Sequence, residues 1–459
     1  MKVRFLIIGG GPTGLGAAYR LRELGEKDFL VIEAEKEVGG LSRSFTDDNG
    51  FVWDVGGHVQ FSHYPYFDAV MKSALSDEQW LKHERESWVW MRDRFIPYPL
   101  QNNLRHLPPS DLWKCVEGLV DANRSAPKGS PAHFGEWMRR IFGSGLAHVF
   151  LEPYNFKVWA TPPEKMAYHW IGERVSVVDL RQALRGIVFQ TDDLSWGPNH
   201  TFRFPHKGGT GAVWRRVGDL VGRDSIRLGS RVSRLDSGKA VLESGEEIRF
   251  EHCLSTIPLD RAIGLLAGAP AALVQKAARL HHTSTHVCGV GVEGPVPPAL
   301  KGKCWIYFPE PQVPFYRVTH FSHYSPQNVP DPSRQYSLMT EVSESAYKPV
   351  QAERLLGEVV AGLRSSGLIL PGGRVVSEWS YTAPYGYPVP TLERDEILAD
   401  LIPYLEGRNI WSRGRFGGWK YEVSNQDHSL MQGVEWANAR LRGERESTFV
   451  LPEITRKAA

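Results

Sequence analysis

The feature that most constrains this chain is a glycine-rich turn close to its N-terminus. Residues 3–8, VRFLII, form an uninterrupted apolar run of the kind found in buried parallel strands. GGGPTGLG follows directly, and leucines and alanines then recur at helical spacing until Gly25. The next apolar run, FLVIEAE, contains Glu33 near its end. This order predicts a strand–helix–strand unit with a nucleotide-binding turn.

The chemistry of that turn depends on three glycines and one acid. Gly9 permits a tight turn, Gly11 lets the backbone approach a pyrophosphate, and Gly14 allows the helix to pack closely on the strand. The N-terminus of the helix favours phosphate charge. Glu33 follows about 20 residues later, where an acid can bind ribose hydroxyls. A turn without a ligand is the simpler alternative, but the complete pattern favours a bound dinucleotide.

A second glycine pair indicates which dinucleotide is bound. Gly39 and Gly40, in AEKEVGGLSRSF, offer another close backbone approach to the same pyrophosphate. This pairing resembles the glutathione-reductase-like FAD family of the amine-oxidase type. The strands around Val232, which end in CLSTIP, resemble the returning segment of that family. The resemblance implies FAD as the cofactor.

Composition excludes several other classes of protein. The net charge of +2, with no long basic run, argues against nucleic-acid binding. No apolar run reaches about 18 residues, so no membrane span is expected. The first residues show no signal-peptide pattern, and the four scattered cysteines indicate free buried thiols in a reducing compartment. We therefore expect a cytoplasmic protein, and we expect no metal site.

The hydrophobic patterns predict an α/β multidomain protein in which a Rossmann-like FAD-binding domain is assembled from separated segments. Residues 104–195 carry apolar side chains at helical spacing, whereas residues 286–345 alternate apolar and polar residues as antiparallel strands do. From about residue 391 the chain returns to a strand, a loop and a helix. The predicted divisions are an FAD-binding domain (1–95, 203–285 and 391–450), a helical domain (96–202), an antiparallel-sheet substrate domain (286–390) and a C-terminal tail (451–459).

The segment WDVGGHVQFSHY, residues 53–64, is the next candidate for the site. In folds of this type the segment runs under the isoalloxazine ring. Gly56 and Gly57 would let the backbone lie flat there, where a Cβ atom would clash. His58 would then lie beside the ring, with His63 as a supporting neighbour. A hydrogen-bonded core histidine is the alternative for a lone histidine, but the surrounding glycines favour the flavin.

Longer motifs narrow the family. IPYPLQNN, EPYNFKVWATPPEKM, WGPNHTFRFPHKGGTG, GYPVPTLER and IWSRGRFGGWKYEVSNQDHS, in this order, are similar to the UDP-galactopyranose mutases of the eukaryotic type, roughly over residues 5–440. The resemblance implies a reaction with no net oxidation, in which N5 of reduced FAD attacks the anomeric carbon of a nucleotide-sugar. The nucleotide diphosphate leaves, and the sugar ring closes again through a different hydroxyl. UDP-galactopyranose and UDP-galactofuranose, or close relatives, are the implied substrates, with NADPH or NADH as the reductant.

The resemblance also assigns catalytic roles. Arg174 and Arg317 match arginines that clamp the diphosphate, a task that suits the planar fork and fixed charge of a guanidinium. Without the motifs, both would be taken as surface arginines. His58 is implied to act through its main chain, which hydrogen-bonds N5, rather than as an acid or base.

The remaining implied residues fall into three groups. The uridine, sugar and phosphate positions are Tyr98, Gln101, Asn155, Trp159, Asn199, Trp305, Tyr307, Tyr324, Tyr387 and Tyr421. The further flavin positions are Gly414, Asn425, Gln426 and Ser429, beside Gly57 and the residues already named. The nicotinamide donor is assigned to Arg85, Ser87 and Arg415.

Three functions remain open at this point. His323 stands where the family has an amide, and Lys420 stands where it has an arginine, so the sugar and the oligomeric state are left undecided. The first function is the mutase. The second is a net FAD-dependent oxidase or desaturase of the amine-oxidase or protoporphyrinogen-oxidase type. The third is a flavoprotein that binds nucleotide-sugars without turning them over.

Overall fold

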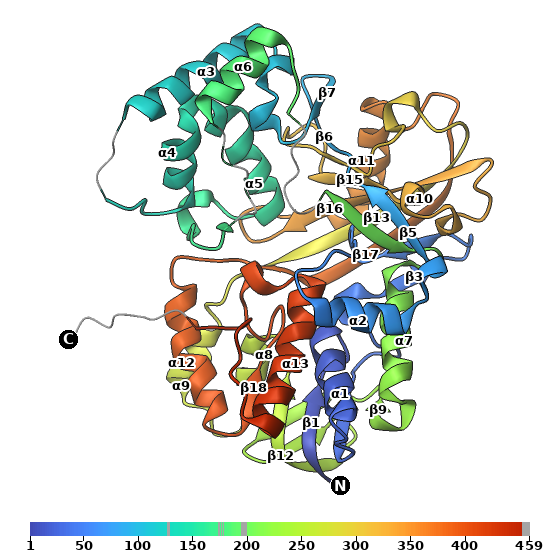
Figure 1. Cartoon of the computed structure of the whole chain (residues 1–459), viewed down its shortest axis with the longest axis vertical. Helices are drawn as coiled ribbons and strands as arrows, with labels where there is room; N and C mark the ends of the chain where they lie inside the picture. Colours follow the sequence, from blue (N-terminus) through green and yellow to red (C-terminus); the bar gives the residue numbers. More distant parts are fainter. Residues whose placement is uncertain (126–128, 173–174, 176, 178, 194–199, 452–459) are drawn as a thin grey trace.

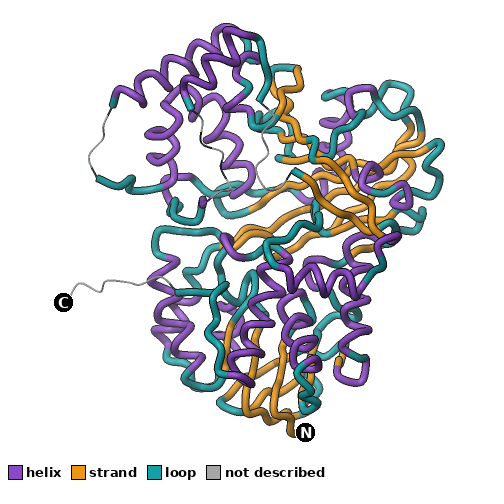
Figure 2. Tube along the Cα trace, in the orientation of Figure 1, coloured by secondary structure: helices purple, strands orange, loops and turns teal. Residues whose placement is uncertain are grey.

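The computed structural model describes residues 1–125, 129–172, 175, 177, 179–193 and 200–451. Two large sheets dominate these residues, one in the lower and one in the upper half of the view, with helices packed around them (Figure 1). Figure 2 shows a largely helical region beside the upper sheet. The predicted α/β fold class is confirmed.

The first sheet contains the predicted strand–helix–strand unit. Strand β1 (Lys2–Ile8) pairs in parallel with β2 (Phe29–Ile32) and with β12 (Glu247–Ser255), which places it near the centre of the sheet. Its apolar side chains are buried on both faces, as the uninterrupted apolar run requires. The other strands are β9 (Ile226–Arg227), β10 (Val232–Asp236), β11 (Lys239–Leu242) and β18 (Ile410–Ser412).

Helices α1 (Pro12–Glu23) and α13 (Gln426–Arg442) pack against each other beside this sheet, although they come from opposite ends of the chain.

The carboxylate of Asp54 lies at the N-terminus of α7 (Gly209–Val221) and accepts hydrogen bonds from the Thr210 N–H at 3.2 Å and from the Ser44 hydroxyl. The other helices of this half are α2 (Pro65–Ala74), α8 (Leu259–Leu265), α9 (Ala271–Ala277) and α12 (Arg394–Glu406).

The second sheet is mostly antiparallel, in the order β17-β13-β16-β15-β14-β6-β7. Its strands are β6 (Ser87–Met91), β7 (Arg94–Pro97), β13 (His282–Glu293), β14 (Trp305–Tyr307), β15 (Arg317–His320), β16 (Gln335–Glu344) and β17 (Arg374–Pro388). Helix α11 (Ala352–Ser365) packs against this sheet, and α10 (Phe321–Tyr324) follows β15. The predicted domain boundary falls between residues 95 and 96. Strand β6 lies before this boundary and β7 crosses it, yet both strands belong to the second sheet. The division into domains stays a prediction.

Two short antiparallel strand pairs and a helical region belong to the described fold as well. The pairs are β3 (Ser44–Thr46) with β4 (Val52–Asp54) and β5 (Trp80–Glu84) with β8 (Thr201–Pro205). The helical region contains α3 (Pro109–Arg124), α4 (Phe134–Leu146), α5 (Glu152–Trp159) and α6 (Leu180–Phe189).

One buried lysine joins the helical region to the second sheet. The Lys157 ammonium on α5 donates to the backbone carbonyls of Glu310 and Val313, at 2.8 and 2.9 Å. Burial lowers the pKa of this amine to about 7. The contact fixes α5, one face of which lines the candidate site described below.

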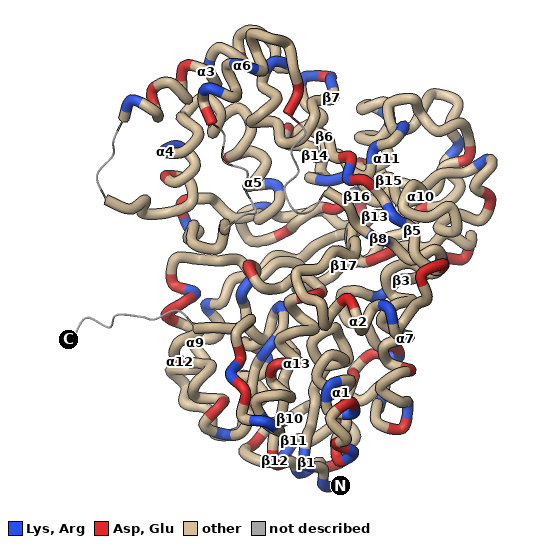
Figure 3. The backbone as a smooth tube through the Cα atoms, viewed as in Figure 1, with Lys and Arg blue, Asp and Glu red and all other residues tan. Residues whose placement is uncertain are grey.

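The distribution of charged side chains and the state of the cysteines agree with what the composition predicts. Basic and acidic side chains are interspersed over both halves of the molecule (Figure 3). The four cysteines are free and buried. Within the described ranges, every helix is too short or too polar to cross a bilayer.

Candidate active site

A cavity of about 2050 Å³ lies where the two sheets and helix α5 meet. Its lining includes residues that follow the carboxyl ends of β1, β2, β12 and β18, where ligands bind in open α/β sheets. The opposite lining comes from β14, β15, β16 and β17 of the second sheet. Ordinary small-molecule pockets measure roughly 300–1,000 Å³. The volume is therefore sufficient for a dinucleotide and a second ligand together.

The glycine turn forms a cradle that side chains would fill. Gly9 has a φ of +106°, and a Cβ atom on Gly14 would lie 1.9 Å from the Gly9 carbonyl oxygen. The turn meets the second glycine pair directly, because a Cβ atom on Gly40 would lie 3.2 Å from the Cα of Gly11. Both loops thus present bare backbone to one end of the cavity. This arrangement fits the pyrophosphate of FAD.

Glu33 lies at the same end, where its carboxylate lines the cavity. It accepts hydrogen bonds from the backbone N–H groups of Gly10 at 2.6 Å and Glu35 at 2.9 Å. These bonds hold the carboxylate in place at the end of β2, where a ribose would lie. Val232, on the first strand of the returning segment, lines the cavity nearby.

The C-terminal flavin positions line the cavity as well. The members of this group are Gly414, Asn425, Gln426 and Ser429. The side-chain oxygen of Gln426 accepts hydrogen bonds from the Trp214 indole at 2.6 Å and from the Gln60 amide at 2.9 Å. This pair of bonds fixes the orientation of the Gln426 amide at the first turn of α13.

A buried ion pair occupies the wall formed by the second sheet. Arg317 on β15 lies opposite Glu341 on β16, and the two side chains form two hydrogen bonds of 2.8 Å. The Glu341 carboxylate also accepts hydrogen bonds from the Tyr316 hydroxyl at 2.6 Å and from the Gly57 N–H at 2.9 Å. The Tyr316 hydroxyl lies 3.3 Å from that of Tyr387. One carboxylate thus connects the glycine segment to the arginine predicted to clamp the diphosphate.

The charges of this cluster are well defined. Burial by itself raises the pKa of Glu341, but Arg317, Tyr316 and Gly57 outweigh this effect and hold the pKa below its usual range. Glu341 was not among the predicted site residues. The signal available in the sequence was an acid in the interior of an otherwise apolar strand, YSLMTEVSE, whose other acid, Glu344, lies at the strand end. Its pairing with Arg317 could not be predicted, because it depends on the register between two strands.

His58 lines the cavity beside this cluster. Burial lowers the pKa of its imidazole to about 4; Glu341 opposes this shift, and Arg415 and Arg317 add to it. Its Nδ1 atom has no hydrogen-bond partner among the described residues. The imidazole is therefore neutral near pH 7, and it can still accept or donate one hydrogen bond to a ligand.

Aromatic rings form the third wall. Tyr307 lies between Tyr98 and Tyr154, with ring centroids 5.1 and 5.3 Å away, and Trp159 lies 4.8 Å from Tyr421. Rings in such positions suit stacking on a base or a flavin. Tyr154 was not predicted, although it lies one residue before Asn155 in the EPYNFKVW motif.

Gln101, Asn155 and Trp305, which were predicted to bind the substrate, differ in the hydrogen bonds that they already form within the protein. Gln101 is almost completely buried and lines the cavity. The Asn155 amide donates to the Leu151 carbonyl of its own helix at 2.8 Å. The Trp305 indole N–H is buried without a partner among the described residues, so it is a donor for a ligand in the cavity.

Two arginines border the cavity at the positions predicted for a nicotinamide donor. The Arg85 guanidinium lies over the rings of Trp305 and Tyr98, at 5.1 and 5.8 Å, and its Nε donates to Ser87. Arg415 donates to the Gly386 carbonyl and to the Ser424 hydroxyl, each at 2.9 Å. Both side chains are held by neighbours while lining the cavity.

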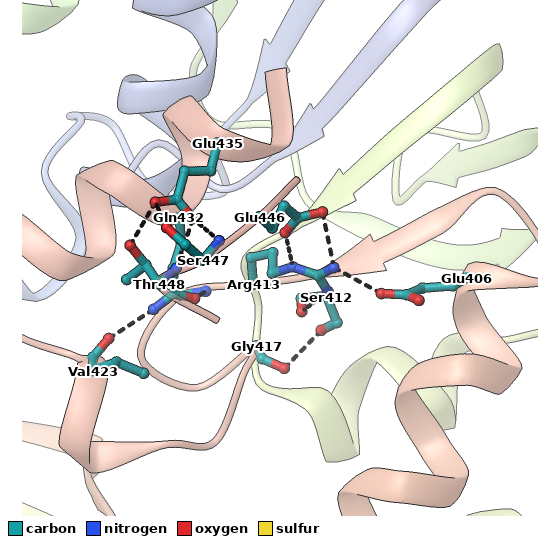
Figure 4. A network of polar contacts seen from close by, with 11 residues as sticks. Glu406, Ser412, Arg413, Gly417, Val423, Gln432, Glu435, Glu446, Ser447 and Thr448 are labelled. Carbon is teal, nitrogen blue, oxygen red and sulfur yellow. Dashed lines mark hydrogen bonds and ion pairs between the residues drawn. The ribbon is translucent and has the colours of Figure 1, made fainter. Parts of the chain in front are cut away.

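A polar network fixes the loop that carries Gly414 and Arg415. Figure 4 shows the Arg413 guanidinium between the carboxylates of Glu446 and Glu406, at 2.6 and 2.7 Å. The Gly414 N–H donates to Gln432 at 2.7 Å. The C-terminal segment around Glu446 is therefore bonded to the loop that lines the cavity.

Several predicted residues do not line the cavity. Tyr324 is buried among the rings of Phe202, Phe204 and Phe321, and Ser87 lies behind Arg85. Gly14 and Gly39 lie beneath the cradle rather than on its surface. Arg174 and Asn199 lie outside the described residues.

One trio in the described part of the chain has the spacing of metal ligands. His63, Asp427 and His428 place nitrogen and oxygen atoms within 4.8 Å of one another. The Asp427 carboxylate already accepts hydrogen bonds from Nδ1 of His63 at 2.7 Å and of His428 at 3.0 Å. Although burial opposes it, these bonds hold the pKa of Asp427 at about 2. The hydrogen bonds account for the arrangement.

Comparisons with known proteins agree with this geometry. The family described as flavin containing amine oxidoreductase matches residues 12–403. The crystal structure of a reduced UDP-galactopyranose mutase is 45% identical, with a TM-score of 0.94 over 98% of this chain and 96% of that one. A putative protoporphyrinogen oxidase from Exiguobacterium sp. 255-15 shares the fold at 17% identity, with a TM-score of 0.70 over 95% of this chain and 98% of that one.

Curated relatives are more distant. The mitochondrial protoporphyrinogen oxidase of Nicotiana tabacum is 24% identical over 299 residues, which are 56% of this chain and 58% of that protein. The matched region spans between 31% and 58% of the plant protoporphyrinogen oxidases that it resembles.

Proposed function

This chain belongs to the flavin-containing amine oxidoreductases and, within them, to the UDP-galactopyranose mutases, and on this premise we propose that it is an isomerase for UDP-galactose or a close relative. It interconverts the pyranose and furanose forms of the nucleotide-sugar with no net oxidation. FAD is the cofactor, and its reduced form is the active one. The 45% identity to a mutase across nearly all of both chains supports the substrate class.

The observation that carries the proposal is the position of Arg317. A partly buried guanidinium paired with Glu341 lines the same cavity as the glycine cradle. An oxidase of small amines or porphyrins has no need for such a cation, which can fork onto phosphate oxygens. A reaction that expels a nucleotide diphosphate does need one, because the leaving group gains charge as the glycosyl bond breaks.

The cavity lining fits FAD. Gly9, Gly11 and Gly40 would hold the pyrophosphate, and Glu33 would bind the ribose. The first turn of α13 and the loop at Gly414 would hold the flavin end. When bound and reduced, FAD supplies an electron-rich ring nitrogen able to attack a glycosyl carbon.

The protein residues then divide the remaining work. Arg317 receives the diphosphate, and the hydroxyls of Tyr387 and Tyr421 extend the same anion site. The rings of Tyr98 and Trp159, with the amide of Gln101, hold the uridine. His58 stays neutral, so its backbone rather than its imidazole charge serves the flavin face. Arg174, Asn199 and Tyr324 keep their proposed roles as predictions.

Reduction of the cofactor is assigned to a nicotinamide donor, NADPH or NADH. Arg85 and Arg415 line the cavity with fixed guanidinium groups, which suits the phosphates of such a donor. We expect the yellow holoenzyme to bleach on addition of NADPH under nitrogen, and Arg85→Ala to slow bleaching by NADPH but not by dithionite. Equal slowing by both reductants would contradict this role of Arg85.

The central test is product analysis. The dithionite-reduced holoenzyme, incubated with UDP-galactofuranose, is expected to yield UDP-galactopyranose by chromatography. Arg317→Lys should lower kcat/KM on the order of 100-fold, since a point charge replaces a bidentate fork. Arg223→Lys, whose side chain is 88% exposed, is the matched control and should leave turnover unchanged.

The same experiment separates the alternatives. An oxidase would consume oxygen and release peroxide in proportion to substrate, with the oxidised cofactor. A flavoprotein that only binds nucleotide-sugars would show binding without product. Failure to isomerise any of a panel of UDP-, dTDP- and GDP-hexoses under reducing conditions would refute the proposed function.

A further inference from the structure

The proposed reaction moves one proton within the sugar. In a hexopyranose the anomeric carbon C1 is bonded to O5, and in a hexofuranose it is bonded to O4. Conversion of the pyranose to the furanose breaks the C1–O5 bond and forms the C1–O4 bond, so O4 loses a proton and O5 gains one. The reverse reaction returns the proton. We therefore expect, beside the sugar, a side chain that can both accept and donate a proton near neutral pH.

The carboxylates that line the cavity do not suit this task. Glu341 is paired with Arg317, and Asp260 accepts a hydrogen bond from the Tyr385 hydroxyl at 2.8 Å. The other acids of the described lining follow strands β2 and β11 at the dinucleotide end of the cavity, and these are Glu33, Glu35 and Glu243. Each carboxylate is thus either bonded already or remote from the sugar.

Histidines are the remaining candidates, because tyrosine hydroxyls, with an ordinary pKa of about 10, stay protonated near neutral pH. Burial lowers the pKa of His58 to about 4, so its imidazole is a weak base. The other two histidines of the described lining are His63 and His428. The His63 side chain is 42% exposed and that of His428 is 13% exposed, so His63 is the more accessible to a ligand.

A buried carboxylate fixes the orientation of the His63 ring. Nδ1 of His63 lies 2.7 Å from Oδ2 of Asp427, and the His63 backbone N–H donates to the same oxygen at 3.0 Å. The Asp427 side chain is almost completely buried. Because an ionised carboxylate can only accept hydrogen bonds, Nδ1 carries the proton and Nε2 keeps its lone pair. The neutral ring therefore presents an acceptor on the edge that faces away from Asp427.

His63 lies at the flavin end of the cavity. It follows Gly57 by six residues in the same segment, and Asp427 belongs to the first turn of α13. In the proposed complex this turn holds the flavin, and Arg317 holds the diphosphate. The sugar between them would then lie on the side of the cavity where the His63 ring is fixed.

On the basis of the proposed function, we propose that His63 carries the proton between O4 and O5 of the sugar. The proton leaves O4 for Nε2 and passes from Nε2 to O5. The electron pair of the C1–O5 bond stays on O5, and that of the O4–H bond forms the C1–O4 bond, so the step needs no oxidant or reductant. Asp427 is the positioning residue, since it fixes the tautomer of His63 and its charge stabilises the imidazolium.

The first test replaces His63 by glutamine, whose amide can still donate to Asp427 but cannot take up a proton. With UDP-galactofuranose and the dithionite-reduced holoenzyme, kcat should fall on the order of 100-fold in His63→Gln. The KM, the Kd for UDP and the visible spectrum of the bound flavin should stay as in the wild type. The matched control is His148→Gln, a side chain 67% exposed outside the cavity, which should turn over like the wild type.

The pH profile separates proton transfer from a structural role. Among the described residues, Asp427, His428 and Tyr64 are the titratable groups that contact His63. All three remain in His63→Gln. Wild-type kcat should fall as the pH is lowered, because a protonated imidazole cannot accept the proton of O4. This acid limb should be absent from His63→Gln.

Chemical rescue supplies a second measurement. In His63→Gly, added imidazole should restore turnover on the order of tenfold, and substituted imidazoles should act in the order of their basicity. A wild type that isomerises while His63→Gln keeps the same kcat overturns the role of His63 alone. The same holds for a fall in kcat that keeps the acid limb and is not rescued by imidazole. A wild type that yields no isomer overturns the proposed function as well.

Discussion

Replacing Glu341 by glutamine removes the charge of this residue while keeping its shape. In the native protein the carboxylate bonds Arg317, Tyr316 and the Gly57 N–H. The amide of glutamine offers one oxygen to the four donor groups of these three residues, and it leaves the guanidinium without a counter-charge. Breaking a buried ion pair on one side costs about 3–5 kcal/mol. Because the Arg317 side chain keeps 21% exposure, we expect the free energy of unfolding to fall by about 3 kcal/mol.

The same change should strengthen binding of the nucleotide diphosphate. If Arg317 holds the diphosphate as proposed, Glu341 lies close behind it and repels the phosphate charge. At a separation of roughly 7 Å and an effective dielectric constant of about 20, this repulsion is about 2 kcal/mol for each phosphate charge. Its removal should lower the Kd for UDP by at least about tenfold, even after partial loss through rearrangement of Gly57.

Two measurements on the same preparation check this reasoning. Urea unfolding of the holoenzyme gives the change in stability, and calorimetric titration with UDP gives the change in affinity. Glu344→Gln is the matched control, because Glu344 lies on the same strand but bonds His286 away from the cavity. Loss of stability together with weaker UDP binding would refute the proposed competition between Glu341 and the diphosphate. Unchanged stability would refute the importance of the ion pair itself.

Three further predictions follow from the structure. Gly14→Ala should yield colourless protein without FAD, as judged from its visible spectrum, because the added methyl group would lie 1.9 Å from the Gly9 carbonyl oxygen. Burial lowers the pKa of His320 to about 3, below its unfolded value near 6.5, so the unfolded state binds more protons between these values and stability falls as the pH falls. His320→Asn should therefore reduce the slope of unfolding free energy against pH in that window by up to about 1.4 kcal/mol per pH unit, and an unchanged slope would contradict the assignment. Glu446→Gln should lower stability by about 2–3 kcal/mol in thermal or urea unfolding, since Arg413 keeps only Glu406; full stability would show that the C-terminal segment is dispensable.

Local sequence was sufficient for the cofactor end of the site. The order of apolar run, glycines, helix and acid forces one backbone path, because Gly9 and Gly14 occupy positions where a Cβ atom has no room. The family resemblance pointed to Arg317 and Tyr387, and both line the cavity. Tyr324 was assigned in the same way, yet its ring is buried outside the cavity, since three phenylalanines from other segments surround it.

The sequence by itself determined the features that depend on short-range patterns. These are the N-terminal nucleotide-binding unit, the fold class and the identity of the family. Only the tertiary structure decided the partners of the charged groups. Arg317 and Glu341 are 24 residues apart and meet because β15 and β16 pair in one register, and Gly57, nearly 300 residues from Glu341, reaches the same carboxylate. Such contacts depend on the packing of whole sheets, which no short-range pattern encodes.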